Sequence, residues 1–340
     1  MSHSLPLVSV IITTYRNEIY LPRAIESVLN QSYSNIELIV VDDNAPDSQA
    51  RTNTEAVMTR YPQAVYLKHP ENRNGAAARN TGIRAANGQY LAFLDNDDIY
   101  FSDHIADCVA LLQENPDCNS VVCGVVKIRG GMCWELIPAP TGDLYRELLF
   151  RETALGTGSN LFVSRAAVRQ IGGFDERFRR HQDVEFGLRY FASNKVCSLP
   201  KVQIIKEMDG FSNVPDFPRF LSTKQLLWDT FRQDLEVLTP EDRNRYFAGQ
   251  YSSLLYTACK AGDKANIQWV LAQLTACRPV NRKEQLLVAL SRLGLFHTYE
   301  ALKKAMKAIR SGGLRSQVSR DLSAYDLSLL AQALAGGKRR

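Results

Sequence analysis

The chain has 340 residues, of which 45% are hydrophobic and 23% are charged, and its formal net charge is +5. This length allows one large domain and a smaller one, and the composition is ordinary for a globular protein with a sizeable core. The longest apolar runs, residues 7–12 and 36–41, are far too short to cross a membrane as a helix. No basic stretch followed by an apolar one opens the chain, so we expect no signal peptide.

The first hundred residues alternate between strand and helix patterns. Apolar, largely β-branched runs predict strands at residues 7–12, 36–41, 64–67 and 90–95. Apolar residues at helical spacing predict helices at residues 18–31, 47–61 and 76–86. This alternation predicts an α/β fold of the Rossmann-like kind, with a mostly parallel sheet and helices on both faces.

The pattern becomes mixed after residue 100 and then entirely helical. We expect helices at 103–114, 143–150 and 183–191, and strands at 120–128, 161–163 and 202–205. Two prolines between residues 213 and 218 indicate a linker, so we divide the chain into a domain at 1–212 and a C-terminal helical region at 213–340. Helical spacing in that region predicts helices at 221–238, 240–261, 264–277, 282–293, 299–309 and 323–335.

Seven cysteines are present, an odd number, and none of them belongs to a Cys-x-x-Cys pair. This spacing argues against a disulfide framework and against a zinc site built from cysteines. We therefore expect reduced thiols and a cytoplasmic location.

Two of the predicted strands end in acidic clusters, Asp42-Asp43 and the group of Asp95, Asp97 and Asp98. Right-handed crossovers bring both strand ends to one edge of the sheet, where open α/β sheets bind ligands. Asp-rich turns are the alternative interpretation, but two clusters at one edge favour a ligand site. The Asp95-x-Asp97 spacing suits a hard cation, Mg²⁺ or Mn²⁺, whose coordination shell substrate phosphates complete.

Two further charged residues are candidates for the same site. Arg79 lies on the helix before the acidic strand and either contacts a nucleotide diphosphate or forms a surface salt bridge. Asp183 lies at a predicted helix N-terminus, where it serves either as an N-cap or as the base that deprotonates an acceptor hydroxyl. The sequence has no Walker A motif, and its Gly-x-Gly at 156–158 precedes a strand, which excludes a dinucleotide fingerprint.

These pieces, in this order, resemble the inverting family-2 glycosyltransferases of the GT-A fold. The matching stretches are residues 8–17, 38–44, 74–82, 90–98, 171–176 and 181–183. The resemblance implies a nucleoside-diphosphate sugar donor, a divalent metal and inversion by direct displacement. Two positions depart from the family's common pattern: His181-Gln182-Asp183 stands where Gly-Glu-Asp is common, and Asn44-Ala45 stands where Gly-Ser is common.

The motifs and the resemblance together assign the site residues. The donor-binding residues are Thr13, Tyr15, Asp43, Arg79 and Asp95. Asp97 is the implied ligand of Mg²⁺ or Mn²⁺, and Asp183 is the implied catalytic base. We expect a UDP-sugar donor and a glycan or lipid-linked acceptor, in the synthesis of cell-surface polysaccharide, O-antigen or lipooligosaccharide.

Two other functions compete with this one. A non-catalytic module of the same fold would bind a sugar nucleotide or a protein, but the presence of both Asp97 and Asp183 favours an enzyme. A nucleotidyltransferase would also use a metal and carboxylates. It normally has a Gly-rich phosphate loop, however, and residues 13–17 contain no glycine.

Residues 300–340 contain nine basic and only three acidic side chains. Such a segment is typical of a chain that contacts an anionic surface, either nucleic acid or membrane. We expect peripheral contact with the inner face of the cell membrane, where lipid-linked acceptors lie, and no nucleic-acid partner. A helical region that only supports the first domain is the alternative.

Overall fold

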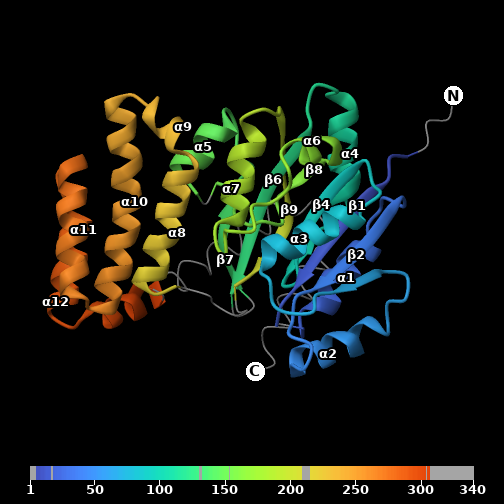
Figure 1. Ribbon diagram of the computed structural model, residues 1–340, viewed down its shortest axis with the longest axis horizontal. Coiled ribbons are helices and arrows are strands. Elements are labelled where there is room, and N and C mark those ends of the chain that lie inside the picture. The colour runs from blue at the N-terminus through green and yellow to red at the C-terminus, as the bar shows by residue number, and fades with distance from the viewer. Residues whose placement is uncertain are drawn as a thin grey trace. The chain divides into compact units, whose positions relative to one another are not determined.

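The computed structural model describes residues 5–16, 18–129, 132–152, 154–208, 215–303 and 305–306 (Figure 1). The chain divides into two compact units, whose described parts are residues 5–208 and 215–306. All the predicted site residues belong to the first unit.

The first unit is built on one mixed sheet, to which nine strands of the described chain belong. They are β1 (Val8–Thr14), β2 (Ile36–Asp42), β3 (Val65–Lys68), β4 (Tyr90–Asp95), β5 (Asp98–Tyr100), β6 (Ser120–Arg129), β7 (Met132–Ile137), β8 (Phe162–Ser164) and β9 (Val196–Glu207). The order is β3-β2-β1-β4-β8-β6-β9-β5, with β7 paired to β6. Strands β1 to β4 are parallel, whereas β8, β7 and β5 run antiparallel to their neighbours.

Helices cover both faces of this sheet, as the alternating pattern predicts. Val8, Val10 and Ile12 of β1 join one buried cluster with α1 (Leu21–Leu29) and α4 (His104–Glu114). Ile11 points to the other face, where it contacts α3 (Gly75–Ala85) at Gly82. The remaining helices of this unit are α2 (Gln49–Met58), α5 (Leu144–Phe150), α6 (Arg165–Gln170) and α7 (Gln182–Phe191).

Two short antiparallel strands were not predicted. Residues 98–100, for which no element was predicted, form β5, in which Ile99 and Tyr100 are buried and pair with β9. Residues 132–137 form β7, which pairs antiparallel with β6. Strand β9 extends well beyond the predicted 202–205.

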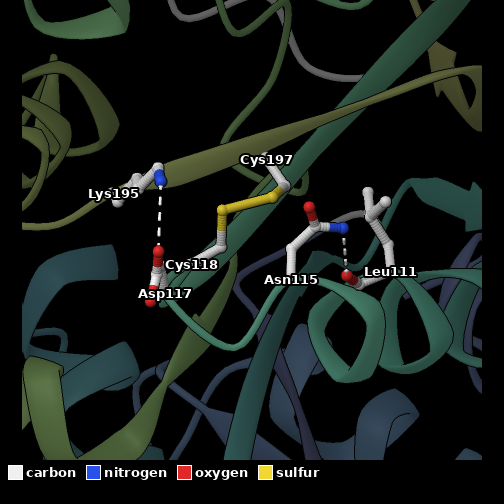
Figure 2. Close-up of a disulfide and its surroundings, with 6 residues drawn as sticks. All are labelled: Leu111, Asn115, Asp117, Cys118, Lys195 and Cys197. Atoms are coloured by element: carbon white, nitrogen blue, oxygen red, sulfur yellow. Dashed lines mark hydrogen bonds and ion pairs between the residues drawn. A yellow bond between two sulfur atoms is a disulfide. The ribbon is translucent and has the colours of Figure 1, made fainter.

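The expectation that all cysteines are reduced thiols is wrong. Cys118, just before β6, and Cys197, near the start of β9, form a disulfide with their Cα atoms 6.0 Å apart (Figure 2). An ion pair of Asp117 and Lys195, 3.6 Å apart, lies beside it. The two cysteines are 79 positions apart in sequence, and they meet because β6 and β9 are parallel neighbours. The cysteine content therefore no longer indicates a reducing compartment.

The second unit is helical throughout its described residues. Its helices are α8 (Phe217–Thr230), α9 (Arg232–Glu236), α10 (Pro240–Ala261), α11 (Lys264–Cys277) and α12 (Arg282–Arg292), followed by helical residues at 296–303. The helix predicted at 221–238 is two helices, because the backbone leaves the helical region at Phe231. Buried residues of α8, α10, α11 and α12 form a core of their own. The helix predicted at 323–335 lies outside the described residues. None of the described helices combines the length and apolar character that a membrane crossing requires.

Candidate functional site

The carboxyl ends of β2, β1 and β4 meet at one edge of the sheet. In the parallel register, Thr13 at the end of β1 lies beside Asp95, and Thr14 lies beside Asp42. The two acidic clusters therefore flank the end of β1, as the crossover argument predicts. Polar groups end these strands because the strands leave the apolar interior here.

A pocket of about 160 Å³ opens at this edge. It is lined by Thr13, Thr14, Tyr15, Asp43, Gly75, Ala78, Asp95, Asn96 and Asp97. Five of these were assigned from the sequence to the donor or the metal. The fold therefore brings together residues from the ends of β1, β2 and β4 and from the start of α3.

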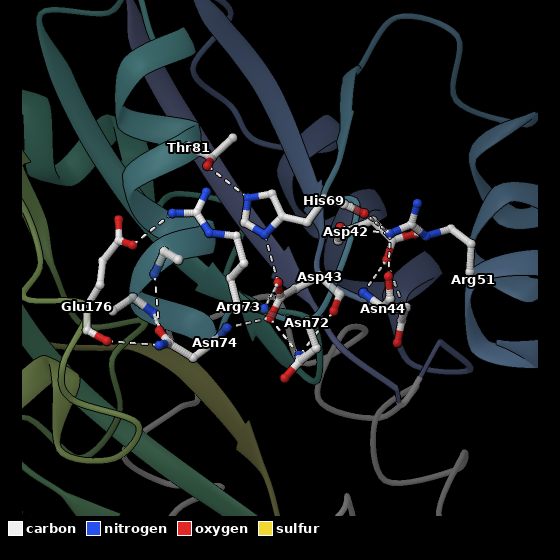
Figure 3. Close-up of polar contacts among 12 residues, drawn as sticks. Asp42, Asp43, Asn44, Arg51, His69, Asn72, Arg73, Asn74, Thr81 and Glu176 are labelled. Carbon is white, nitrogen blue, oxygen red and sulfur yellow. Dashed lines mark hydrogen bonds and ion pairs between the residues drawn. The ribbon is translucent and has the colours of Figure 1, made fainter. Parts of the chain in front are cut away.

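Asp43 is the centre of a polar network at the end of β2. Its carboxylate accepts hydrogen bonds from the backbone N–H groups of Arg73 and Asn74, both at 2.9 Å, and contacts Nδ1 of His69 at 2.7 Å. Figure 3 shows these residues, with Asn72, arranged around it. Asp43 is buried, so it fixes the loop that leads into α3 and also lines the pocket.

The three carboxylates after β4 have different environments. Asp98 is fully buried and accepts hydrogen bonds from the hydroxyl groups of Thr157 and Ser159, both at 2.6 Å. Asp97 faces the pocket. Burial, together with the nearby carboxylates of Asp98 and Asp95, raises the pKa of Asp97 to about 7. A cation beside Asp97 would relieve this crowding of negative charge.

The residues present fit a divalent metal. Within the described ranges, no three His, Cys, Asp or Glu side chains converge on one metal position. An ion here would therefore take one or two protein carboxylates and complete its shell with substrate phosphates, as Mg²⁺ and Mn²⁺ commonly do. Asp97 and Asp95 line the pocket, and buried Oδ1 of Asp98 has no hydrogen-bond partner in the described part of the chain.

Arg79 joins the acidic strand end to helix α7. Its guanidinium donates to Oδ1 of Asp95 at 2.6 Å and to Oε1 of Gln182 at 2.7 Å, and it lies over the ring of Phe174. Burial raises the pKa of Asp95, but the charges of Arg79 and Lys206 and the hydrogen bond from Arg79 together lower it overall. The alternative of a surface salt bridge does not apply, because Arg79 is only 8% exposed.

A larger cavity of about 370 Å³ is also lined by Asp95. Asp95 and Asp183 both line it, with Arg79, Lys206 and a segment at residues 179–182. Asp183 lies in the first turn of α7, and His181, in a left-handed conformation with φ of 58°, is the N-cap residue. Glu185 is buried and bonded to Arg189, away from the cavity lining.

Residues 9–172 match the family model described as Glycosyl transferase family 2. The chain contains a family 2 glycosyltransferase domain. An uncharacterized glycosyltransferase of Rickettsia bellii is 28% identical over 262 residues, which cover 74% of this chain but only 37% of that relative. A relative of the same description in Rickettsia prowazekii is 27% identical over 252 residues, 70% of this chain and 74% of the relative. The match covers 45% of a further relative, from Rickettsia felis. The chain therefore spans less than half the length of the R. bellii and R. felis proteins.

Solved structures show that the fold is of the GT-A kind. Staphylococcus aureus TarS 1–349 in complex with UDP-GlcNAc superposes with a TM-score of 0.60 at 16% identity, covering 89% of this chain and 92% of that one. The mannosyltransferase PcManGT from Pyrobaculum calidifontis, in complex with GDP-Man and Mn²⁺, gives a TM-score of 0.51 at 18% identity, covering 98% and 87%.

The first unit contains one central residue that sequence reasoning missed. Lys206 of β9 lines the larger cavity, with Nζ 3.9 Å from Asp98 and 3.2 Å from the Thr157 hydroxyl. Burial lowers the pKa of Lys206, but the carboxylates of Asp98, Asp95 and Asp97 outweigh it and raise the pKa overall. The sequence feature that could have identified this residue is a lysine directly after the apolar pair at 204–205. The role of this lysine follows only from the β5–β9 register, in which Asp98 pairs with Lys206.

Proposed function

We propose that this chain is an inverting glycosyltransferase, which moves a sugar from a nucleoside-diphosphate sugar to an acceptor hydroxyl. One observation carries the proposal: Asp95 lines both the candidate nucleotide pocket and the cavity that contains Asp183, so the two cavities adjoin at this residue. A donor can place its nucleoside near Thr13 and Asp43, its diphosphate beside Asp95, and its sugar in the larger cavity.

Asp183 is the general base in this proposal. The acceptor oxygen attacks the anomeric carbon of the donor sugar while the bond from that carbon to the diphosphate oxygen breaks. The bonding electron pair leaves with the nucleoside diphosphate, and the acceptor proton moves to the carboxylate of Asp183. Attack opposite to the leaving group inverts the anomeric configuration.

The remaining site residues hold the donor and its charge. Asp97 would hold Mg²⁺ or Mn²⁺, which when bound neutralises the developing charge of the leaving diphosphate. The ammonium of Lys206 adds fixed positive charge in the same region. Arg79 acts on position, because it fixes Asp95 relative to the helix that carries Asp183.

We further propose that the donor is a UDP-sugar and that the acceptor is a glycan or lipid-linked molecule of a cell-surface polysaccharide. The TarS structure with UDP-GlcNAc supports a nucleotide-sugar donor through its shared fold. Lipid-linked acceptors lie at the inner face of the membrane, and the basic segment at residues 300–340 suits peripheral contact there.

Release of nucleoside diphosphate from a panel of sugar nucleotides, with Mg²⁺ or Mn²⁺ and a cell-envelope acceptor fraction, tests the proposal. We expect release that requires both metal and acceptor. Asp183→Asn should lower the rate about 10²- to 10⁴-fold while donor affinity stays near that of the wild type. Asp229→Asn, which alters an exposed carboxylate of the helical unit, is the matched control. Donor binding without any release would instead favour the non-catalytic module.

A further inference from the structure

This inference rests on the proposed function and concerns what the acceptor carries. Four cationic side chains line the larger cavity: Arg79, Arg179, Arg180 and Lys206. Arg79 is bonded to Asp95, and Lys206 lies close to the buried carboxylate of Asp98. Two of the four cations are therefore already balanced by carboxylates of the strand end.

Arg180 also faces carboxylates. Burial lowers the pKa of Arg180, and the nearby carboxylates of Asp183 and Glu152 act in the opposite direction. Glu152 has a second neighbour, because its Oε2 lies 3.5 Å from Nδ1 of His181. The carboxylates of Asp183 and Glu152 therefore have Arg180 or His181 as neighbours.

Arg179 differs from the other three cations. It lines the cavity and is exposed, yet it forms neither a hydrogen bond nor an ion pair with any residue that the structure describes. A guanidinium has five donors in a planar fork, a geometry that matches phosphate and carboxylate groups. Arg180, the next residue, also lines the cavity, so two consecutive arginines contribute to its wall.

The location of these arginines separates them from the candidate metal ligand and the candidate nucleoside contact. Arg179 and Arg180 line only the larger cavity, whereas Asp97 and Asp43 line only the smaller pocket. Arg180 is also close enough to Asp183 for the carboxylate to affect its pKa. An anion bound at the two arginines would therefore lie near the proposed base, on the acceptor side of the reaction centre.

We propose that the acceptor carries an anionic group, a phosphate or a carboxylate, close to the hydroxyl that is glycosylated, and that Arg179 together with Arg180 binds it. This contact orients the hydroxyl toward Asp183. The two arginines are specificity-determining residues, and the bond-making step remains that of the proposed transfer.

Binding of defined probes to the full chain saturated with UDP tests this inference. The probes are glucose 6-phosphate and glucuronate, with methyl glucoside as the neutral reference, followed by ligand-observed NMR. We expect the anionic probes to bind at least about tenfold more tightly than the neutral one, since hydrogen bonds to charged groups are the stronger kind. Arg179→Gln should remove about tenfold of that preference and leave UDP affinity unchanged. Arg169→Gln, an exposed arginine of α6 outside the cavity lining, should change neither quantity.

Three results would overturn the inference. Equal affinity for neutral and anionic probes is one, and a preference that Arg179→Gln leaves intact is another. The third is that Arg179→Gln weakens binding of UDP-glucuronic acid relative to UDP-glucose without affecting the binding of glucose 6-phosphate. That result would mean that the anionic group belongs to the donor. Absence of UDP binding together with absence of turnover on the sugar-nucleotide panel would contradict the proposed function itself. UDP binding and turnover without an anion preference would contradict only this inference.

Discussion

Single residues decide how the two halves of the site are held together, and Arg79 is the clearest case. Its guanidinium holds Asp95 and Gln182 at once, with planar geometry that a lysine ammonium cannot reproduce. We expect Arg79→Lys to keep the charge beside Asp95 and to lower stability by only about 1 kcal/mol. Its kcat should nevertheless fall roughly 10- to 100-fold, because small misplacements of reacting groups are costly.

Steady-state kinetics and urea unfolding of the same variants check this prediction. Arg84→Lys, on the exposed side of the same helix, is the matched control and should leave both measurements near the wild-type values. Arg79→Ala removes one partner of a largely buried ion pair and should cost about 3–5 kcal/mol of folding stability. An Arg79→Lys enzyme with unchanged kcat would show that the bond to Gln182 does not position the base.

The sequence predicts part of this site and misses the rest for a physical reason. Asp95 and Asp97 follow a parallel strand whose end is recognisable from its apolar run. Lys206, Thr157 and Ser159 come from segments distant in sequence from Asp98. Lys206 meets Asp98 because β5 and β9 pair in an antiparallel register, whereas Thr157 and Ser159 reach it from the loop before β8. No local pattern encodes that pairing, since β5 has three residues and its neighbour is more than 90 positions away.

At the scale of elements, the same contrast separates the two parts of the sheet. Strands β1 to β4 alternate with helices along the chain, and this pattern predicts that they are parallel. The first two connections join neighbouring strands, whereas the connection from β3 crosses to place β4 beside β1. Strands β6 and β9 are the opposite case. They are parallel neighbours with β7, α5, β8, α6 and α7 between them in the chain. Their disulfide was missed because it depends on this long-range pairing.

The disulfide should contribute substantially to the stability of the β6–β9 pair. Closing a loop between residues 79 positions apart lowers the entropy of the unfolded chain. For a loop of this size, that model gives about 4 kcal/mol. We expect the Cys118→Ser, Cys197→Ser double variant to lose roughly 2–5 kcal/mol in urea unfolding. Dithiothreitol should destabilise the wild type and leave the double variant unaffected. Equal stability of the two proteins under oxidising conditions would contradict this expectation.

At the scale of the whole molecule, the proposed chemistry and the proposed membrane contact involve different parts of the chain. Every residue that lines the two pockets lies between residues 13 and 206, whereas the excess of basic side chains lies beyond residue 300. A transferase whose acceptor is embedded in a membrane gains from this separation, because a basic segment can raise the local enzyme concentration without altering the pocket. The charge pattern and the proposed acceptor therefore support the same location.

Deleting residues 312–340 tests this attachment. The deletion removes five basic and two acidic side chains, a net loss of three positive charges. Each basic charge near an anionic lipid surface contributes about 1 kcal/mol, so affinity for phosphatidylserine-containing vesicles should fall roughly 100-fold. Sedimentation with these vesicles measures the change, and vesicles of phosphatidylcholine alone should bind neither protein. Replacing only Lys338, Arg339 and Arg340 with glutamine should reproduce most of the loss, because the driving force is charge rather than apolar burial. Vesicle binding that survives the deletion and persists at high salt would instead favour a helical region that only supports the first domain.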